Sequence, residues 1–275
     1  MKAPGPSWVD WSTVAAVRAT AALPRLSWAE AVQTIDAEDT PTGLIQLCPQ
    51  NGARARTPLT TGLLDQLRAR HPRRRFRLHA NHRLHQAPAI AYDASTVAAH
   101  WDSCFEPLAR LHRHLEADVY SLHAGRCSQA SRTELARGVA RLETLFGSPV
   151  AVEGLYPSRR EALHISTSEG YRWLLDSGLF MAIDLSHLHI VRTVEGDFDL
   201  GLLDALLQSG RCLEVHLSHN NGRADQHRDL SAAPPWWWEA VVRAVRERPG
   251  LPVLCESLAA RVQPSLQLST NMDAH

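Results

Sequence analysis

Short apolar runs alternate with segments of helical periodicity along most of the chain. Seven runs have the length and composition of buried strands, and they lie at residues 43–47, 76–79, 119–123, 150–153, 180–184, 212–216 and 253–256. Strands that alternate with helices in this way predict a parallel α/β fold. Seven strands over this length predict a (β/α)8 TIM barrel.

The segments between these runs carry the signals of helices. At residues 132–146 the apolar positions from Leu135 to Phe146 fall on one helix face, which would pack against a core. Ser166 and Glu169 have the spacing of a capping box, and Gly178 would end the helix that begins there. Further helices are expected at residues 60–70, 95–117, 199–208 and 234–245.

The two ends of the chain depart from this pattern. Residues 1–40 are expected to form an N-terminal helical segment, so the eighth strand is not placed and the barrel is expected to be irregular or open at its N-terminal strand. Residues 41–264 would form the barrel domain, and the polar residues 265–275 a disordered tail. Trp236, Trp237 and Trp238 cannot all face the core from one helix, so at least one is expected to be exposed or at an interface.

Composition excludes several classes of protein. With 275 residues the chain can bury a full core, and it has neither an apolar run of about 18 residues nor a secretory signal, so a cytoplasmic location is expected. Its 29 basic and 29 acidic side chains balance, which predicts no attraction to nucleic acid or to an anionic membrane. The five cysteines form no Cys-x-x-Cys pair, whereas 15 histidines are a high count.

Most predicted strands end on a side chain that can ligate a metal. In TIM barrels the carboxyl ends of the strands carry the chemistry. Burying several titratable groups together without a cation would cost several kcal/mol each. The pattern therefore predicts a metal site built from His79, His123, Glu153, Asp184, His216 and Glu256.

Further ligands follow two of these strands. His187 comes three residues after Asp184, and a loop with Asn-Asn-Gly turn chemistry brings Asp225 and His227 back towards His216. Nine donors exceed what one ion needs, so two or three ions that share bridging carboxylates are expected. Imidazole and carboxylate ligands suit Fe, Mn or Zn.

The pattern resembles the xylose-isomerase-like TIM barrels, which include the apurinic endonucleases of the endonuclease-four type. Within that superfamily it most resembles the multinuclear non-heme iron-dependent oxidases, from about Leu44 to Glu256. The most specific motifs are Leu78-His79-Ala80-Asn81, Leu122-His123-Ala124-Gly125-Arg126, Val152-Glu153, Ile183-Asp184-Leu185-Ser186-His187 and Asp225-x-His227.

This resemblance implies a grouping of the ligands. His79, His123 and Glu153 would hold one ion. Glu153 would bridge to a second ion, which Asp184, His216 and Glu256 would also hold. His187, Asp225 and His227 would hold a third. Glu153, Asp184 and His216 would then be the catalytic centre.

The resemblance also implies a function. Such an oxidase would use two to three iron ions, Fe(II)/Fe(III), and O2 to modify a ribosomally made precursor peptide in natural-product biosynthesis, at a cysteine or at a C-terminal aspartate. A separate small partner protein would recognise the leader peptide, because nothing in this chain looks like that module. The expected substrate contacts are Asn81, Arg126, Tyr156, Asn220, Asn221 and Arg223.

Two alternatives use the same barrel. A sugar isomerase or epimerase would need two carboxylates and one divalent ion, which leaves His187, Asp225 and His227 without a clear role. A zinc-dependent endonuclease would keep all nine ligands but requires a basic surface that faces DNA. Apart from scattered arginines, the chain offers only the run from Arg73 to Arg75 for such a surface.

Overall fold

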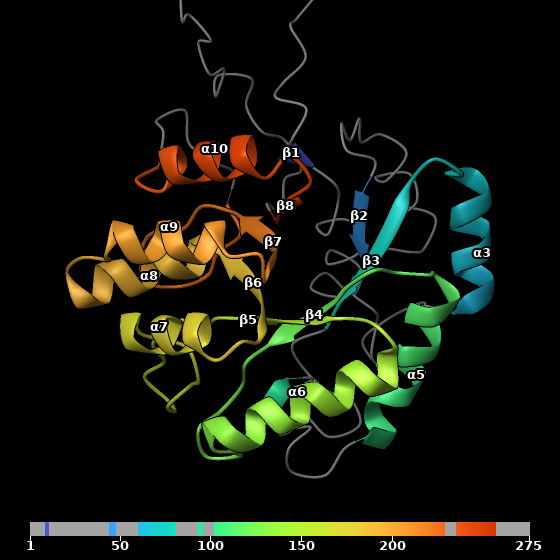
Figure 1. Cartoon of the computed structure of the whole chain (residues 1–275), viewed down its shortest axis with the longest axis horizontal. Helices are drawn as coiled ribbons and strands as arrows, with labels where there is room; N and C mark the ends of the chain where they lie inside the picture. Colours follow the sequence, from blue (N-terminus) through green and yellow to red (C-terminus); the bar gives the residue numbers. More distant parts are fainter. Residues whose placement is uncertain are drawn as a thin grey trace, which may run out of the picture.

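The structure, a computed structural model, describes residues 9–10, 44–47, 60–80, 93–95, 102–228 and 235–256. Eight parallel strands form one sheet in the order β1-β8-β7-β6-β5-β4-β3-β2, and helices surround it (Figure 1). The strands are β1 (Val9–Asp10), β2 (Leu44–Leu47), β3 (Arg75–His79), β4 (Tyr120–His123), β5 (Val150–Glu153), β6 (Phe180–Asp184), β7 (Cys212–Leu217) and β8 (Val253–Cys255). The helices are α3 (Thr61–Arg70), α5 (Asp102–His114), α6 (Arg132–Phe146), α7 (Ser168–Asp176), α8 (Leu185–Glu195), α9 (Leu200–Gln208) and α10 (Trp238–Glu247).

The sheet is a nearly closed TIM barrel, as the sequence predicted. All seven predicted strands are present, and each pairs in parallel with its neighbour. The eighth strand is β1, in which Val9 pairs with Val253 and Asp10 with Leu254. Within the described residues no pairing joins β1 to β2, so the barrel is open at that seam. A strand was not expected at residues 9–10, and the rest of the predicted helical segment and the predicted tail lie outside the described residues.

Helix α6 shows how the sequence directs the outer layer. Ser131 and Glu134 form a reciprocal capping box at its start, and Gly147 ends it in the left-handed conformation with φ 72°. Its buried side chains include Leu135, Leu142 and Phe146, which confirms the apolar face. The barrel core continues inward from this face through Tyr120, Leu122, Val150 and Val152.

Three helix predictions need correction. Helix α7 is capped by Thr167, whose hydroxyl accepts the N–H of Gly170, whereas the Ser166 hydroxyl donates to the carbonyl of Leu163. Helix α8 was not predicted at all. Helix α10 begins at Trp238, four residues later than expected from the Pro234-Pro235 pair.

The three tryptophans are therefore not consecutive residues of one helix. Trp237 and Trp238 are buried, and Trp236 is partly buried against the core. The Arg192 guanidinium lies 4.9 Å from the centre of the Trp236 ring, and Phe198 lies beside it. Contacts inside the chain thus account for the partial burial of Trp236.

Among the described helices, none is both long enough and apolar enough to cross a membrane.

Two polar layers fill the barrel interior. Alternate residues of a strand point to the same face, so Arg77 and His79 on β3, like Glu214 and His216 on β7, both point inward. The lower polar layer lies one to three residues before the strand ends and comprises Gln46, Arg77, Ser121 and Glu214, all buried. The upper polar layer lies at the strand ends and comprises His79, Glu153, Asp184, His216 and Glu256, also buried.

Candidate metal centre

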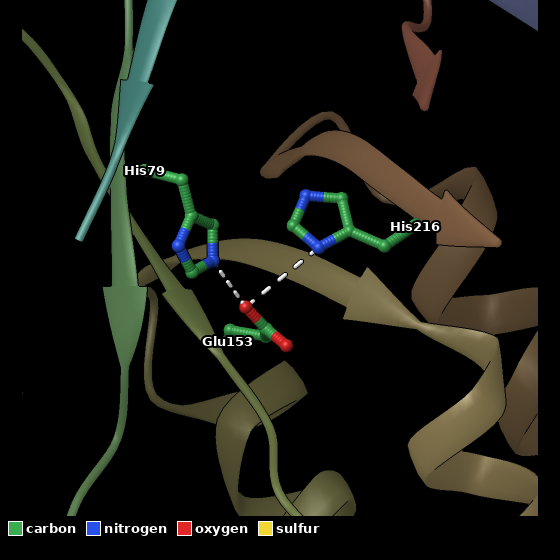
Figure 2. A group of neighbouring side chains, drawn as sticks. All are labelled: His79, Glu153 and His216. Atoms are coloured by element: carbon green, nitrogen blue, oxygen red, sulfur yellow. Dashed lines mark hydrogen bonds and ion pairs between the residues drawn. The ribbon is translucent and has the colours of Figure 1, made fainter. Parts of the chain in front are cut away.

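The upper polar layer brings together donors from five parts of the barrel. Figure 2 shows His79 on β3 and His216 on β7 pointing towards Glu153 on β5. Ligand atoms lie within 4.8 Å of one another in three overlapping groups. These groups are His79, Glu153 and His216; Glu153, Asp184 and His187; and Asp184, His216 and Glu256.

His79 is oriented by the backbone. Its Nδ1 lies 2.8 Å from the carbonyl oxygen of Ala80, which can only accept a hydrogen bond, so Nδ1 carries the hydrogen. In the neutral ring, Nε2 then presents a lone pair to a Glu153 carboxylate oxygen 2.5 Å away. Two hydrogen-bond acceptors this close repel each other unless a positive charge lies between or beside them. That charge can be a proton or a metal ion.

His187 repeats this arrangement from α8. Its Nδ1 lies 2.8 Å from the Gly154 carbonyl oxygen. Its Nε2 faces two carboxylates, with Asp184 Oδ2 at 3.5 Å and Asp225 Oδ2 at 3.6 Å. A backbone carbonyl again fixes the hydrogen on one ring nitrogen and directs the other at the centre.

Asp184 has two separate roles. Its Oδ1 caps α8 by accepting the backbone N–H groups of Ser186, at 2.6 Å, and His187, at 3.1 Å. Its buried Oδ2 has no hydrogen-bond partner in the part of the chain that the structure describes. The helix start therefore holds the carboxylate in place while one oxygen faces the centre.

Several buried atoms of the upper layer that could ligate a metal have no hydrogen bond within the described residues. They are Glu153 Oε1, Asp184 Oδ2 and His216 Nδ1. A buried polar atom left unsatisfied costs about 1–3 kcal/mol, so three in one layer are expensive unless a ligand satisfies them. All three are lone-pair donors, which fits a divalent cation with oxygen and nitrogen ligands.

The electrostatics of the layer favour added positive charge. Burial acts to raise the pKa of Glu153, but His123 and His79 outweigh it and hold that pKa well below its usual value. Burial raises the pKa of Asp184, and the Glu256 and Glu153 carboxylates add to this effect. Burial alone would lower the pKa of His187, yet the Asp184 and Asp225 carboxylates raise it well above the usual value. Carboxylates that raise one another's pKa in this way would be stabilised by an added cation.

The lower layer contacts His216 at Nε2, the ring nitrogen that faces away from Glu153 and Glu256. Glu214 Oε1 lies 3.0 Å from His216 Nε2, and Glu214 also accepts hydrogen bonds from Gln46 and Arg77. Sequence reasoning missed Glu214 and Arg77 because it considered only the strand ends. Their signal was present, since each stands two residues before a ligand on its strand.

The remaining predicted ligands lie at the rim of the centre. His123, Asp225 and His227 side chains are 20%, 15% and 19% exposed. His227 Nε2 is 2.8 Å from Asp225 Oδ2, and His123 Nε2 is 3.6 Å from Glu153 Oε1. All nine predicted ligands therefore converge, six in the three compact groups and three around them.

The residues predicted to contact substrate lie in different surroundings. The Tyr156 ring lies 4.9 Å from the His187 ring, next to the centre. Arg126 pairs with Glu161, and Asn220 is buried, with its amide bonded to Ser186 and Gly222. Asn221 and Arg223 are exposed and joined by a hydrogen bond within their loop, and Asn81 lies outside the described residues.

No protein-family model and no curated protein matches the sequence. Solved structures do match. They include a D-tagatose 3-epimerase-like protein, with TM-score 0.59 and 15% identity over 86% of this chain and 91% of that one. They also include D-allulose 3-epimerase from Methylomonas sp. in complex with D-allulose, with TM-score 0.55 and 14% identity over 92% and 85%. Endonuclease IV from Thermus thermophilus matches with TM-score 0.52 and 18% identity over 83% and 86%.

At these identities the likeness concerns the fold. The chain has the fold of the xylose-isomerase-like and endonuclease IV-like TIM barrels, with a candidate metal centre at the carboxyl ends of its strands. The finer resemblance to multinuclear iron-dependent oxidases stays a hypothesis.

Proposed function

We propose that the protein is a divalent-metal-dependent epimerase or isomerase that acts on a small polyhydroxylated carbonyl compound. The observation that carries this proposal is the buried convergence of Glu153, Asp184, His216 and Glu256 from four neighbouring strands or strand ends. A cation held by these residues would polarise the oxygen atoms of a bound substrate.

Two carboxylates are placed to move a proton. Glu153 Oε2 lies 3.7 Å and Glu256 Oε1 3.6 Å from the same ring nitrogen of His216, although the two side chains come from different strands. One carboxylate would remove the proton from the carbon next to the substrate carbonyl, and the other would return a proton to that carbon. The low pKa of Glu153 keeps it ionised, which is the form in which a carboxylate can accept a proton.

The contacts of the rim residues support this proposal over a zinc nuclease. Asp225 and His227 pair with each other, so they need no third ion to be satisfied. The run from Arg73 to Arg75 leads into the start of β3, at the opposite end of the barrel from His79. A strand of DNA at the metal centre would not meet this run.

Solvent exchange tests the proposal. Protein loaded with Mn²⁺ and incubated in D2O with the ketohexoses D-allulose and D-tagatose is expected to introduce deuterium at the carbon beside the carbonyl, seen by proton NMR. Glu153→Gln and Glu256→Gln should each slow exchange by about 10²-fold or more, because each removes one proton-transfer group. Glu239→Gln, an exposed change on α10, is the control. Absence of exchange across a wider set of aldoses, ketoses and their acids would refute the proposal.

The second candidate is the iron- and O2-dependent oxidase. The observation that favours it is the overlap of the three donor groups, in which Glu153, Asp184 and His216 each belong to two. Shared ligands of this kind suit two or three neighbouring ions. In this case the substrate would be a precursor peptide, delivered with a small leader-binding partner protein.

Metal counting and oxygen uptake separate the two candidates. Anaerobic purification followed by elemental analysis should give about one firmly held divalent ion per chain for the epimerase, against two or three irons for the oxidase. Consumption of O2 by the Fe(II) protein with a cysteine-containing peptide, without deuterium exchange into sugars, would favour the oxidase.

A further inference from the structure

The lower polar layer bears directly on one ligand. Arg77 donates to Glu214 at 3.0 Å and to both oxygens of Asp118 at 2.7 Å. Gln46 donates to the other Glu214 oxygen, at 2.8 Å, and to Ser121. Glu214 is fully buried, and each of its carboxylate oxygens accepts a hydrogen bond from Arg77 or Gln46.

The contact between Glu214 and His216 decides which nitrogen of the His216 ring carries the hydrogen. Flanked by the Arg77 cation and the Gln46 amide, Glu214 is an acceptor for hydrogen bonds, so the hydrogen between it and His216 sits on His216 Nε2. In the neutral ring, His216 Nδ1 then carries the lone pair. This nitrogen is buried, has no hydrogen-bond partner among the described residues, and faces Glu153 and Glu256.

His216 differs in this respect from the other histidines of the compact groups. His79 and His187 direct Nε2 at the centre, and backbone carbonyls orient both rings. His216 directs Nδ1 at the centre, and a side chain orients it. Among these three histidines, only the orientation of His216 can therefore be removed by a single substitution elsewhere.

We propose that Glu214 is a positioning residue that fixes His216 as an Nδ1 ligand of the metal centre, with Arg77 and Gln46 holding Glu214 in place. The inference rests on the metal site of the proposed function and adds the residue that prepares one of its ligands. Removing a carboxylate that orients a ligating histidine costs about 10- to 100-fold in metal affinity.

Two measurements on the full chain test the proposal. Mn²⁺ affinity is read from the free-ion signal in electron paramagnetic resonance. The coordinating nitrogen is read from ¹⁵N NMR of histidine-labelled protein loaded with Zn²⁺. Glu214→Leu removes the acceptor, and Glu214→Gln keeps the shape but removes the charge. Glu239→Gln, the same change at an exposed position of α10, is the matched control.

Wild-type protein and E239Q should show one Nδ1-coordinated histidine, and E214L should lose that pattern with a 10- to 100-fold rise in the Mn²⁺ Kd. The Mn²⁺ Kd of E214Q should lie between those of wild type and E214L. If circular dichroism shows that E214L is unfolded, the Kd of E214Q alone tests the effect on affinity. An unchanged Nδ1 pattern in E214L, or an E214Q affinity within twofold of wild type, overturns the positioning role alone. A wild-type protein that binds neither ion overturns the proposed function and this inference with it.

Discussion

The two polar layers of the barrel are adjacent, equally buried and different in charge balance. In the lower layer each charged group has a partner, because Arg77 bonds to Glu214 and Asp118 and also to the Leu213 carbonyl. In the upper layer Glu153, Asp184 and His216 each have a side-chain atom that no described residue hydrogen-bonds. The charged groups of the lower layer are thus paired, although Gln46 Oε1 has no hydrogen-bond partner among the described residues. The upper layer, in contrast, is arranged to receive a cation.

This difference indicates which buried charges stabilise the fold. Removing one partner of a buried ion pair strongly destabilises the protein, because the other charge remains in a low-dielectric interior. An excess of carboxylate behaves in the opposite way, since removing one negative charge relieves repulsion. Mutations in the two layers should therefore change stability with opposite signs.

The largest effect is expected from Arg77→Met. This change leaves Glu214 buried beside His216 and Gln46 without its cation, and should lower the free energy of unfolding by about 3–5 kcal/mol in urea denaturation. Arg243→Met is the control, because the Arg243–Asp204 pair is exposed and should be worth less than about 1 kcal/mol. Equal losses in the two variants would show that the lower layer is not a structural unit.

Added metal should act on the upper layer alone. Mn²⁺ at 100 times its Kd should raise the free energy of unfolding by about 2.7 kcal/mol, because the ion binds the folded state. The same addition to a His216→Ala variant should raise it much less. Calorimetric melting with and without Mn²⁺ measures both, and a melting temperature that does not respond to the ion would contradict the comparison.

A buried histidine outside both layers supplies a reference. His112 on α5 bonds to Ser148 and packs against Phe146 and Tyr120. Burial is the main cause that lowers its pKa from 6.5 to about 4. The folded state therefore binds fewer protons than the unfolded state between these values, so the contribution of His112 to stability is complete above pH 6.5 and is lost as the pH falls towards 4.

This pH effect is measured by difference. Urea denaturation at pH 7 and pH 5 should show a loss of about 2 kcal/mol in wild type that is absent from His112→Leu, at about 1.4 kcal/mol per pKa unit. Subtracting the variant removes the contribution of the upper-layer histidines, such as His216 with its pKa raised to about 9. Equal pH dependence in both proteins would mean that folding does not lower the pKa of His112.

Local patterns explain what the sequence could predict. The seven apolar runs and the ligands at their ends are recognised from alternation and from the rule that barrel chemistry lies at the carboxyl ends of strands. Strand β1 could not be found, since Val9 and Asp10 are a strand only through their pairing with β8. Ser166 and Thr167 both begin plausible caps, and the extended backbone of Thr167 decides between them.

The supporting side chains of the centre were harder to predict. Asp184 was assigned to a strand end, and its second role as the cap of α8 became visible only when its Oδ1 was placed against Ser186 and His187. Glu214 and Arg77 come from strands β7 and β3, which are far apart in sequence, so their pairing depends on barrel closure. The division of nine ligands among ions depends on distances and cannot be read from spacing.

The smallest effect expected, and the one with the opposite sign, comes from Asp184→Asn. Asparagine caps helices as well as aspartate does, so α8 should keep its start. The change removes one negative charge from beside Glu153 and Glu256, whose carboxylates raise the pKa of Asp184. Without metal the variant should be more stable than wild type by about 1 kcal/mol, and with Mn²⁺ that order should reverse because the ion has lost a charged ligand. Urea denaturation with and without Mn²⁺ gives both values, and a variant that is less stable in the absence of metal would show that the upper layer is as self-sufficient as the lower one.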